Sequence, residues 1–203
     1  MIETFKYEDK NLEDALKKVL VGINAEKEDI FYKTREIEGK LFKSKKIEII
    51  AVKKEDIIKY IKEYLNNISK LTNIDIKSEV KEKDEVIYIT LVTSNNAIII
   101  GKDGRTLNAL QLVLRQSLKI RIDFNIKINL DVSNYKNNKM KNIEQVVRKI
   151  SKEVLESKID AKLDSMNSYE RRFVHTIVSE YSDLSTESEG EEPNRYVIIR
   201  YNK

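Results

Sequence analysis

The stretch IIIGKDGRTL, residues 98–107, sets two glycines three positions apart between two apolar segments, in a chain that has only 5 glycines. Glycine lets the backbone approach another object closely. The free N–H groups at the start of a helix after Gly104 favour an anion, and Lys102 and Arg105 add positive charge. The stretch therefore predicts contact with phosphate, specifically with a sugar–phosphate backbone.

Other phosphate-binding loops do not fit this spacing. Gly101 and Gly104 lack the G-x-x-x-x-G-K-[ST] pattern of a P-loop, and the dinucleotide-binding G-x-G-x-x-G is absent. One alternative stays open on spacing alone, a tight helix–helix turn in which the glycines only relieve backbone strain. Asp103 partly cancels the charge of Lys102, so we expect weaker phosphate affinity than a doubly basic loop would have.

Composition limits the class of protein. The chain has 203 residues, 38 Lys+Arg, 34 Asp+Glu and a net charge of +4, an excess too small by itself to indicate a nucleic-acid partner. Without Cys and with 1 His, disulfides are excluded and a zinc site is disfavoured, so we expect no cofactor and no metal. The polar start is not that of a signal peptide, and no apolar run approaches roughly 18 residues. We expect a cytoplasmic protein without a transmembrane segment.

Residues 1–53 are predicted to form a small βαββ unit. Asn11 is a candidate helix N-cap with Asp14 three residues on, and Gly22 is predicted to end that helix. Strands are predicted over 2–7, 29–36 and 46–52, the last two around a turn at Gly39.

Residues 54–133 are predicted to form a second domain with the order helix, strand, strand, helix, glycine loop, helix, strand. The first helix, over 54–71, has a broad apolar stripe that needs a core to cover. Strands are predicted over 77–81, 86–92 and 125–132. From residue 93 to residue 133 there are six basic and three acidic residues, so most of the charge excess lies here.

Residues 134–203 are predicted to form a third unit of helices with a small sheet. Asn167 and Glu170 form a plausible capping pair for its second helix, and 195–201 is predicted as a closing strand. The segment between them, residues 183–192, is predicted as a loop with five acidic and no basic residues. Two roles stay open for this acidic loop: it repels and so steers a nucleic acid, or it hydrogen-bonds to arginines of its own domain.

The only histidine, His175, lies four residues after Arg171, on the same face of a predicted helix. A lone histidine is more often structural than functional. Catalysis is a poor fit because no Cys nucleophile is available and no carboxylate at a motif spacing orients the imidazole. We therefore expect no enzyme activity from this pair.

The middle segment resembles a KH domain of the bacterial type II order, whose G-x-x-G loop clamps single-stranded RNA. The resemblance rests on residues 98–111 and on the element order around them. It implies backbone contacts at Gly101, Lys102, Asp103, Gly104 and Arg105, and an apolar groove lined by Ile98, Ile99 and Leu107.

The third unit resembles an R-3-H domain, a module that binds single-stranded nucleic acid. The resemblance rests on E-R-R-x-x-H at 170–175 and on the stretch from Thr186 to Arg195. It implies that Arg171 contacts phosphate or stacks on a base and that His175 donates a hydrogen bond or stacks. Arg172 and Arg195 are auxiliary contacts by the same resemblance.

The combination resembles the Jag family of SpoIIIJ-associated proteins, also called KhpB or EloR, with an α+β fold of three small domains over 1–53, 54–133 and 134–203. The D-V-S-N-Y-K link at 131–136 strengthens the resemblance. It implies a bacterial cytoplasmic RNA-binding regulator linked to cell elongation, division or sporulation. It also implies a small KH-only partner protein and a membrane-insertase system as a peripheral associate. A homodimer and single-stranded DNA as the ligand stay open.

A second functional class stays open beside RNA binding. In that alternative the chain is a protein-interaction scaffold whose N-terminal unit and KH helices bind other proteins, and its nucleic-acid binding is residual. Asp103 and the acidic loop favour this alternative.

Overall fold

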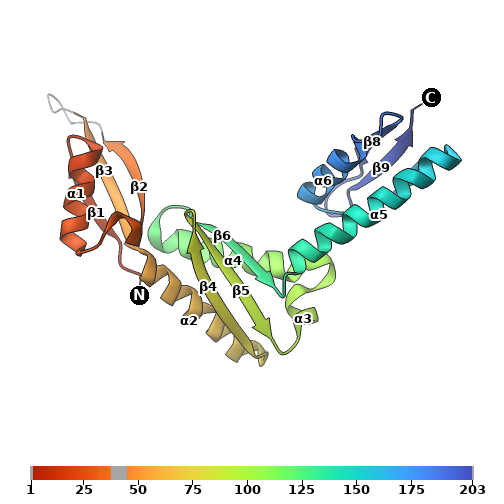
Figure 1. The fold of residues 1–203 in the computed structure, drawn as a ribbon. Helices are drawn as coiled ribbons and strands as arrows, with labels where there is room; N and C mark the ends of the chain where they lie inside the picture. Colours follow the sequence, from red (N-terminus) through yellow and green to blue (C-terminus); the bar gives the residue numbers. More distant parts are fainter. Residues whose placement is uncertain (1, 38–44, 203) are drawn as a thin grey trace. The chain divides into compact units, whose positions relative to one another are not determined.

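The computed structural model describes residues 2–37 and 45–202 and confirms the predicted α+β class. It contains three three-stranded sheets, with strand orders β1-β3-β2, β4-β5-β6 and β7-β9-β8 (Figure 1). The chain divides into two compact units, residues 1–133 and 134–203. The expected further boundary at 53/54 remains a prediction.

The first sheet is antiparallel and carries one helix. Its strands are β1 (Phe5–Asp9), β2 (Ile30–Ile37) and β3 (Lys46–Lys53), and the helix is α1 (Leu12–Ile23). Asn11 caps α1 by accepting a hydrogen bond from the Asp14 amide at 2.9 Å, as predicted. The helix buries Ala15, Val19 and Ile23 against β3, where Ile49 and Ala51 are buried in turn.

The prediction that Gly22 ends α1 is wrong. The helix continues to Ile23, and Asn24 provides the left-handed C-cap with φ 50°. Gly22 lies inside the helix, where a glycine is needed because a Cβ would overlap the hydroxyl end of Tyr7. The turn predicted at Gly39 lies outside the described residues.

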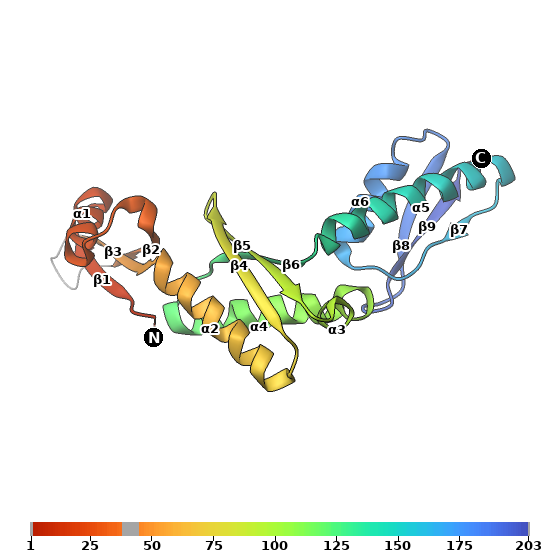
Figure 2. The same ribbon diagram turned by 60° about the horizontal axis from the view of Figure 1, so that its bottom comes forward.

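The second sheet has the element order predicted for a type II KH domain. Helix α2 (Lys54–Thr72) precedes the antiparallel pair β4 (Ile76–Lys83) and β5 (Val86–Thr93). Helices α3 (Asn96–Ile100) and α4 (Arg105–Ile122) follow, and β6 (Lys127–Val132) pairs with β5 in parallel. Helices α2 and α4 cover one face of the sheet (Figure 2). That face is buried, and its residues include Ile87, Ile89, Leu91 and Leu130.

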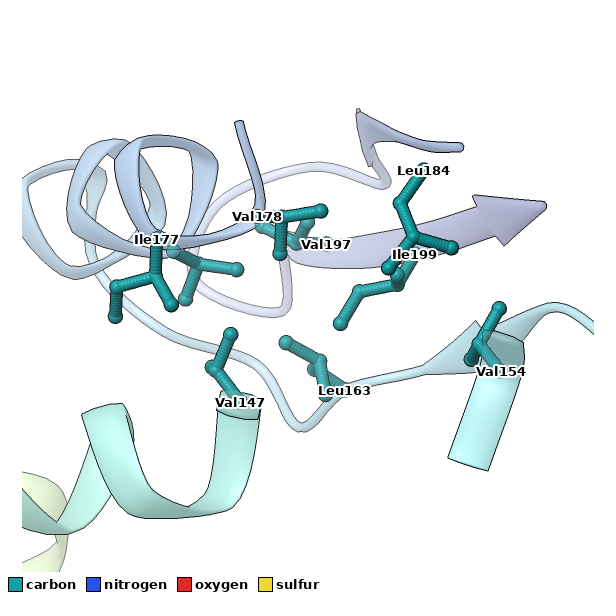
Figure 3. Packing of buried hydrophobic residues seen from close by; sticks show 9 residues of the cluster. Val147, Val154, Leu163, Ile177, Val178, Leu184, Val197 and Ile199 are labelled. Atoms are coloured by element: carbon teal, nitrogen blue, oxygen red, sulfur yellow. The ribbon is translucent and has the colours of Figure 1, made fainter. Parts of the chain in front are cut away.

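The second compact unit packs two helices on the third sheet. Helix α5 (Tyr135–Ser157) and α6 (Ser168–Val178) join the short β7 (Ala161–Lys162), β8 (Leu184–Glu189) and β9 (Tyr196–Tyr201). The predicted pair Asn167 and Glu170 forms a capping box at the start of α6. Figure 3 shows the apolar core between the elements, which includes Val147, Val154, Val174, Ile177, Val197 and Ile199.

The loop prediction for residues 183–192 is wrong over most of its length, because Leu184–Glu189 forms strand β8 and pairs with β9. The inward side chains of β8 after Leu184 are Thr186 and Ser188, which are polar. The apolar alternation that normally reveals a strand is therefore missing. The two-residue strand β7 was not predicted.

No helix in the described parts of the chain is long and apolar enough to cross a membrane.

The core of the second unit yields a test of the fold. Ile199 is fully buried in β9, so Ile199→Ala should lower the free energy of unfolding by about 2–5 kcal/mol. Ile159 is 70% exposed, and Ile159→Ala should change the free energy of unfolding by less than about 0.5 kcal/mol. Urea denaturation of both variants measures the difference. Equal losses would show that the packing of β9 is misassigned.

Candidate nucleic-acid interface

The glycine loop joins α3 to α4 through a backbone that only glycine adopts easily at two positions. Gly101 has φ 68° and Gly104 has φ 80°. A Cβ on Gly101 would overlap the Thr106 side chain, because the first turn of α4 packs directly on this glycine. The requirement for Gly101 is therefore partly structural, as the turn alternative proposed.

The same loop presents positive charge at the start of a long helix. Lys102, Asp103 and Arg105 are exposed, whereas Gly104 is buried. Within the described residues neither Lys102 nor Arg105 makes an ion pair. Gly104 is the N-cap of α4 and provides no side-chain acceptor for the first-turn amides. The partial positive charge of this helix end adds to that of the two cations.

The structure distributes the three predicted groove residues unequally. Ile98 is 53% exposed beside the loop, while Ile99 and Leu107 are 5% and 1% exposed. Successive residues of a helix point about 100° apart, so Ile98 and Ile99 face in different directions. Ile99 and Leu107 therefore support the loop from the core, and Ile98 is the member that offers apolar surface.

A side-chain hydrogen bond fixes α4 to the neighbouring strand. Gln111 accepts a hydrogen bond from the Leu130 amide of β6 at 2.9 Å through its side-chain oxygen. Helix α4 is thereby held against the edge strand, and the loop at its start is held in place with it.

In the second unit, Arg171 is a buried residue with partners of its own. It is 7% exposed, and its Nη1 donates to the Met166 carbonyl at 2.7 Å. The same Nη1 lies 2.8 Å from a carboxylate oxygen of Glu192. The resemblance assigns Arg171 to a nucleic acid, but its guanidinium holds the segments on both sides of α6 together.

His175 is engaged at both ring nitrogens. Nδ1 lies 2.6 Å from Thr186 Oγ1, and Nε2 lies 2.9 Å from Ser188 Oγ. The imidazole thus ties α6 to the inward face of β8. Burial, and secondly the positive charge of Arg171, lower the pKa of His175 below its ordinary value.

The acidic residues of segment 183–192 are largely paired with arginines of their own unit. Arg200 contacts Glu187 at 3.1 Å and Glu189 at 2.7 Å, and Glu192 contacts Arg171. Of the two roles left open for this segment, the structure shows the internal hydrogen bonding. No pattern in the sequence indicated Glu192 as the partner of Arg171, because the two residues lie on distant parts of the chain.

The two auxiliary arginines differ in setting. Arg172 is exposed on α6 and, in residues 2–37 and 45–202, makes no ion pair. Arg195 is half-buried, and its Nε has no hydrogen-bond partner among those residues. Arg172 is therefore the signature-motif cation that is available to a ligand.

The setting of His175 yields a pH test. Its pKa is lowered on folding, so the unfolded chain binds the proton more readily and stability should fall as pH drops through and below 6.5. Because His175 is the only histidine, His175→Gln should remove this dependence between about pH 7.5 and 5.5. Unfolding free energies at several pH values measure the slope. A slope shared by parent and variant would contradict the assignment.

Comparison with known proteins supports the domain composition. Residues 141–201 match the family model of the R-3-H domain, and residues 58–129 match that of the KhpA/KhpB KH domain. RNA-binding protein KhpB of Clostridium symbiosum is 30% identical over 195 residues, covering 94% of this chain and 88% of that protein.

Two further relatives carry the same name, RNA-binding protein KhpB. The Bacillus subtilis protein is 27% identical over 80% of this chain and 79% of its own length. The Lactiplantibacillus plantarum protein is 25% identical over 73% of this chain, which spans about half of that relative (46%). With a 30% identical relative matched along most of both sequences and with both domain models present, the chain belongs to the KhpB (Jag) family.

Proposed function

We propose that this protein binds single-stranded RNA through the loop at 101–105 and, at a second place, through the 134–203 unit. The observation that carries the proposal is the start of α4, where two positive-φ glycines lie beside an uncapped helix end. Two cations are exposed there, and neither forms an ion pair with any other described residue. Such an end binds phosphate through its main-chain amides. The names of the relatives, RNA-binding protein KhpB, point the same way.

The proposed grip needs no catalytic group. Phosphates lie against the first-turn amides of α4, Lys102 and Arg105 neutralise charge, and Ile98 offers an apolar contact for a base. Asp103 weakens the attraction. Two modest sites on one chain still give useful affinity, because binding at one raises the effective concentration at the other. A regulatory role in cell elongation, division or sporulation is part of the proposal.

His175 supports a non-catalytic interpretation of the second unit. A catalytic histidine is normally oriented by a third group, most often a carboxylate. In the described residues the imidazole of His175 is bonded to the hydroxyls of Thr186 and Ser188 of its own domain, and no carboxylate contacts it. We therefore propose that bound RNA is held and not cleaved.

The decisive test is a salt titration with a short single-stranded RNA. Binding should weaken as salt rises. In a plot of log affinity against log salt concentration, the steepness of the decline should decrease by about 0.7 for each phosphate contact that is lost. Lys102→Gln with Arg105→Gln should lower that slope by about 1.4, and Gly101→Asp with Lys102→Asp should abolish most binding. The matched control is Lys59→Gln with Lys62→Gln, which removes two exposed cations of α2. Equal effects in both pairs, or binding insensitive to salt, would overturn the proposal.

A second candidate function, protein association, is favoured by the outer face of α4. Val113 and Ile120 are 52% and 81% exposed on one helical face, and Leu112, which is 48% exposed, borders that face. An exposed apolar stripe of this kind marks an interaction surface. A small KH-only protein or a second copy of this chain are the partners we propose for it.

Sedimentation tests the second candidate. If the α4 stripe associates, the parent should sediment as a dimer at micromolar concentration, and Val113→Glu with Ile120→Glu should give a monomer that still binds RNA. Glu at an exposed position of β5, as in Val92→Glu, is the control, because Val92 is 62% exposed elsewhere on the domain. A parent that is monomeric alone and with a KH-only protein rejects association through this face.

A further inference from the structure

Helix α6 is fixed on one side by buried and bonded residues. Val174, Ile177 and Val178 lie in the core shown in Figure 3, and Glu170 is buried in the capping box. Arg171 and His175 add the bonds to Met166, Glu192, Thr186 and Ser188. The two signature residues thus hold the helix in place, which determines what its opposite side presents.

The opposite side of α6 carries an aromatic ring and a cation. Tyr169 is 68% exposed, and Arg172 and Thr176 are exposed at the next positions of the same helical face. These three residues, called the α6 stripe below, supply a ring, a guanidinium and a hydroxyl. The α6 stripe itself is therefore free of negative charge. Other arginines of the unit, such as Arg148 and Arg200, are paired with carboxylates, whereas Arg172 makes no ion pair within the described residues.

Helix α5 neutralises the acidic groups at both ends of α6. Lys139 contacts Glu170 at 2.7 Å, and Arg148 contacts Glu180 at 2.7 Å. These pairs show that the two helices run side by side in the same direction. They also offset the negative charge that would otherwise repel a phosphate from the stripe. The exposed side of α6 therefore combines an available ring with an uncompensated positive charge.

We propose that Tyr169 and Arg172 form the contact of the second unit with single-stranded nucleic acid, Tyr169 by stacking on a base and Arg172 by binding the adjacent phosphate. The inference rests on the proposed function and assigns it to specific side chains. Arg171 and His175 then act as positioning residues that hold α6. Because every base has a π-face, the stacking contact is tolerant of sequence and is shared by RNA and DNA.

A single substitution makes this contact directly visible. The chain contains no Trp, so Tyr169→Trp introduces the only indole. Stacking on a base should quench its emission as oligouridylate or oligothymidylate is added, in parallel with binding followed by a label on the oligonucleotide. Ile159→Trp, at a 70% exposed position of the same unit, is the matched control and should stay unquenched.

Affinities of the full chain provide the second arm. Tyr169→Ala should weaken binding about 5- to 100-fold, the range expected for one lost stacking contact, while Tyr169→Phe should keep most of it. Arg172→Gln should lower the salt slope by about 0.7. The charge-matched control Lys152→Gln, exposed on α5, should leave affinity within about twofold if only the stripe is contacted.

The outcomes separate this inference from the function on which it rests. One outcome is that the labelled oligonucleotide binds the parent, the indole of Tyr169→Trp is not quenched, and Tyr169→Ala binds with the affinity of the parent. In that case the α6 stripe is not the contact, and RNA binding through the glycine loop stands. If Ile159→Trp is quenched equally, the signal is non-specific and the inference falls. If the parent binds neither oligonucleotide, the proposed function itself fails.

Discussion

The backbone turn from Gly101 to Gly104 is the constraint on which the rest of the proposed function depends. Thr106 occupies the space that a side chain at Gly101 would need, so α4 starts directly at the turn. Gly104 leaves the first amides of that helix without a side-chain cap. The two cations beside it then act on the same small region, and Gln111 fixes the helix to β6. A structural requirement for glycine and the proposed phosphate-binding helix end thus coexist in one loop.

In the second unit the two signature residues, Arg171 and His175, make their contacts inside the domain. Arg171 and His175 hold the two flanks of α6, and the carboxylates of segment 183–192 pair with arginines. Glu187, Glu189 and Glu192 are neutralised by Arg200 and Arg171, whereas the exposed Arg172 makes no ion pair within the described residues. The proposed contact on α6 is therefore compatible with the markedly acidic segment of the same unit.

Local features of the fold were predictable from sequence, and features that depend on distant partners were not. The caps at Asn11 and Asn167 were predicted because donor and acceptor lie within three residues of each other. The prediction for Gly22 is wrong because this glycine makes room for Tyr7, and Tyr7 belongs to another element. Strand β8 was not predicted because its inward residues, Thr186 and Ser188, are polar and contact His175, so the strand lacks an apolar alternation. For the candidate site, the loop and its cations followed from spacing, whereas the burial of Ile99, Leu107 and Arg171 depends on tertiary packing.

The central claim is that main-chain amides at the start of α4 hold phosphate. Backbone amide chemical shifts, recorded while a short single-stranded RNA is added, test it most directly. The account predicts saturable shifts for the amides from Lys102 to Leu107 that diminish as salt is raised. Unchanged shifts at these amides, with the RNA demonstrably bound, would contradict it.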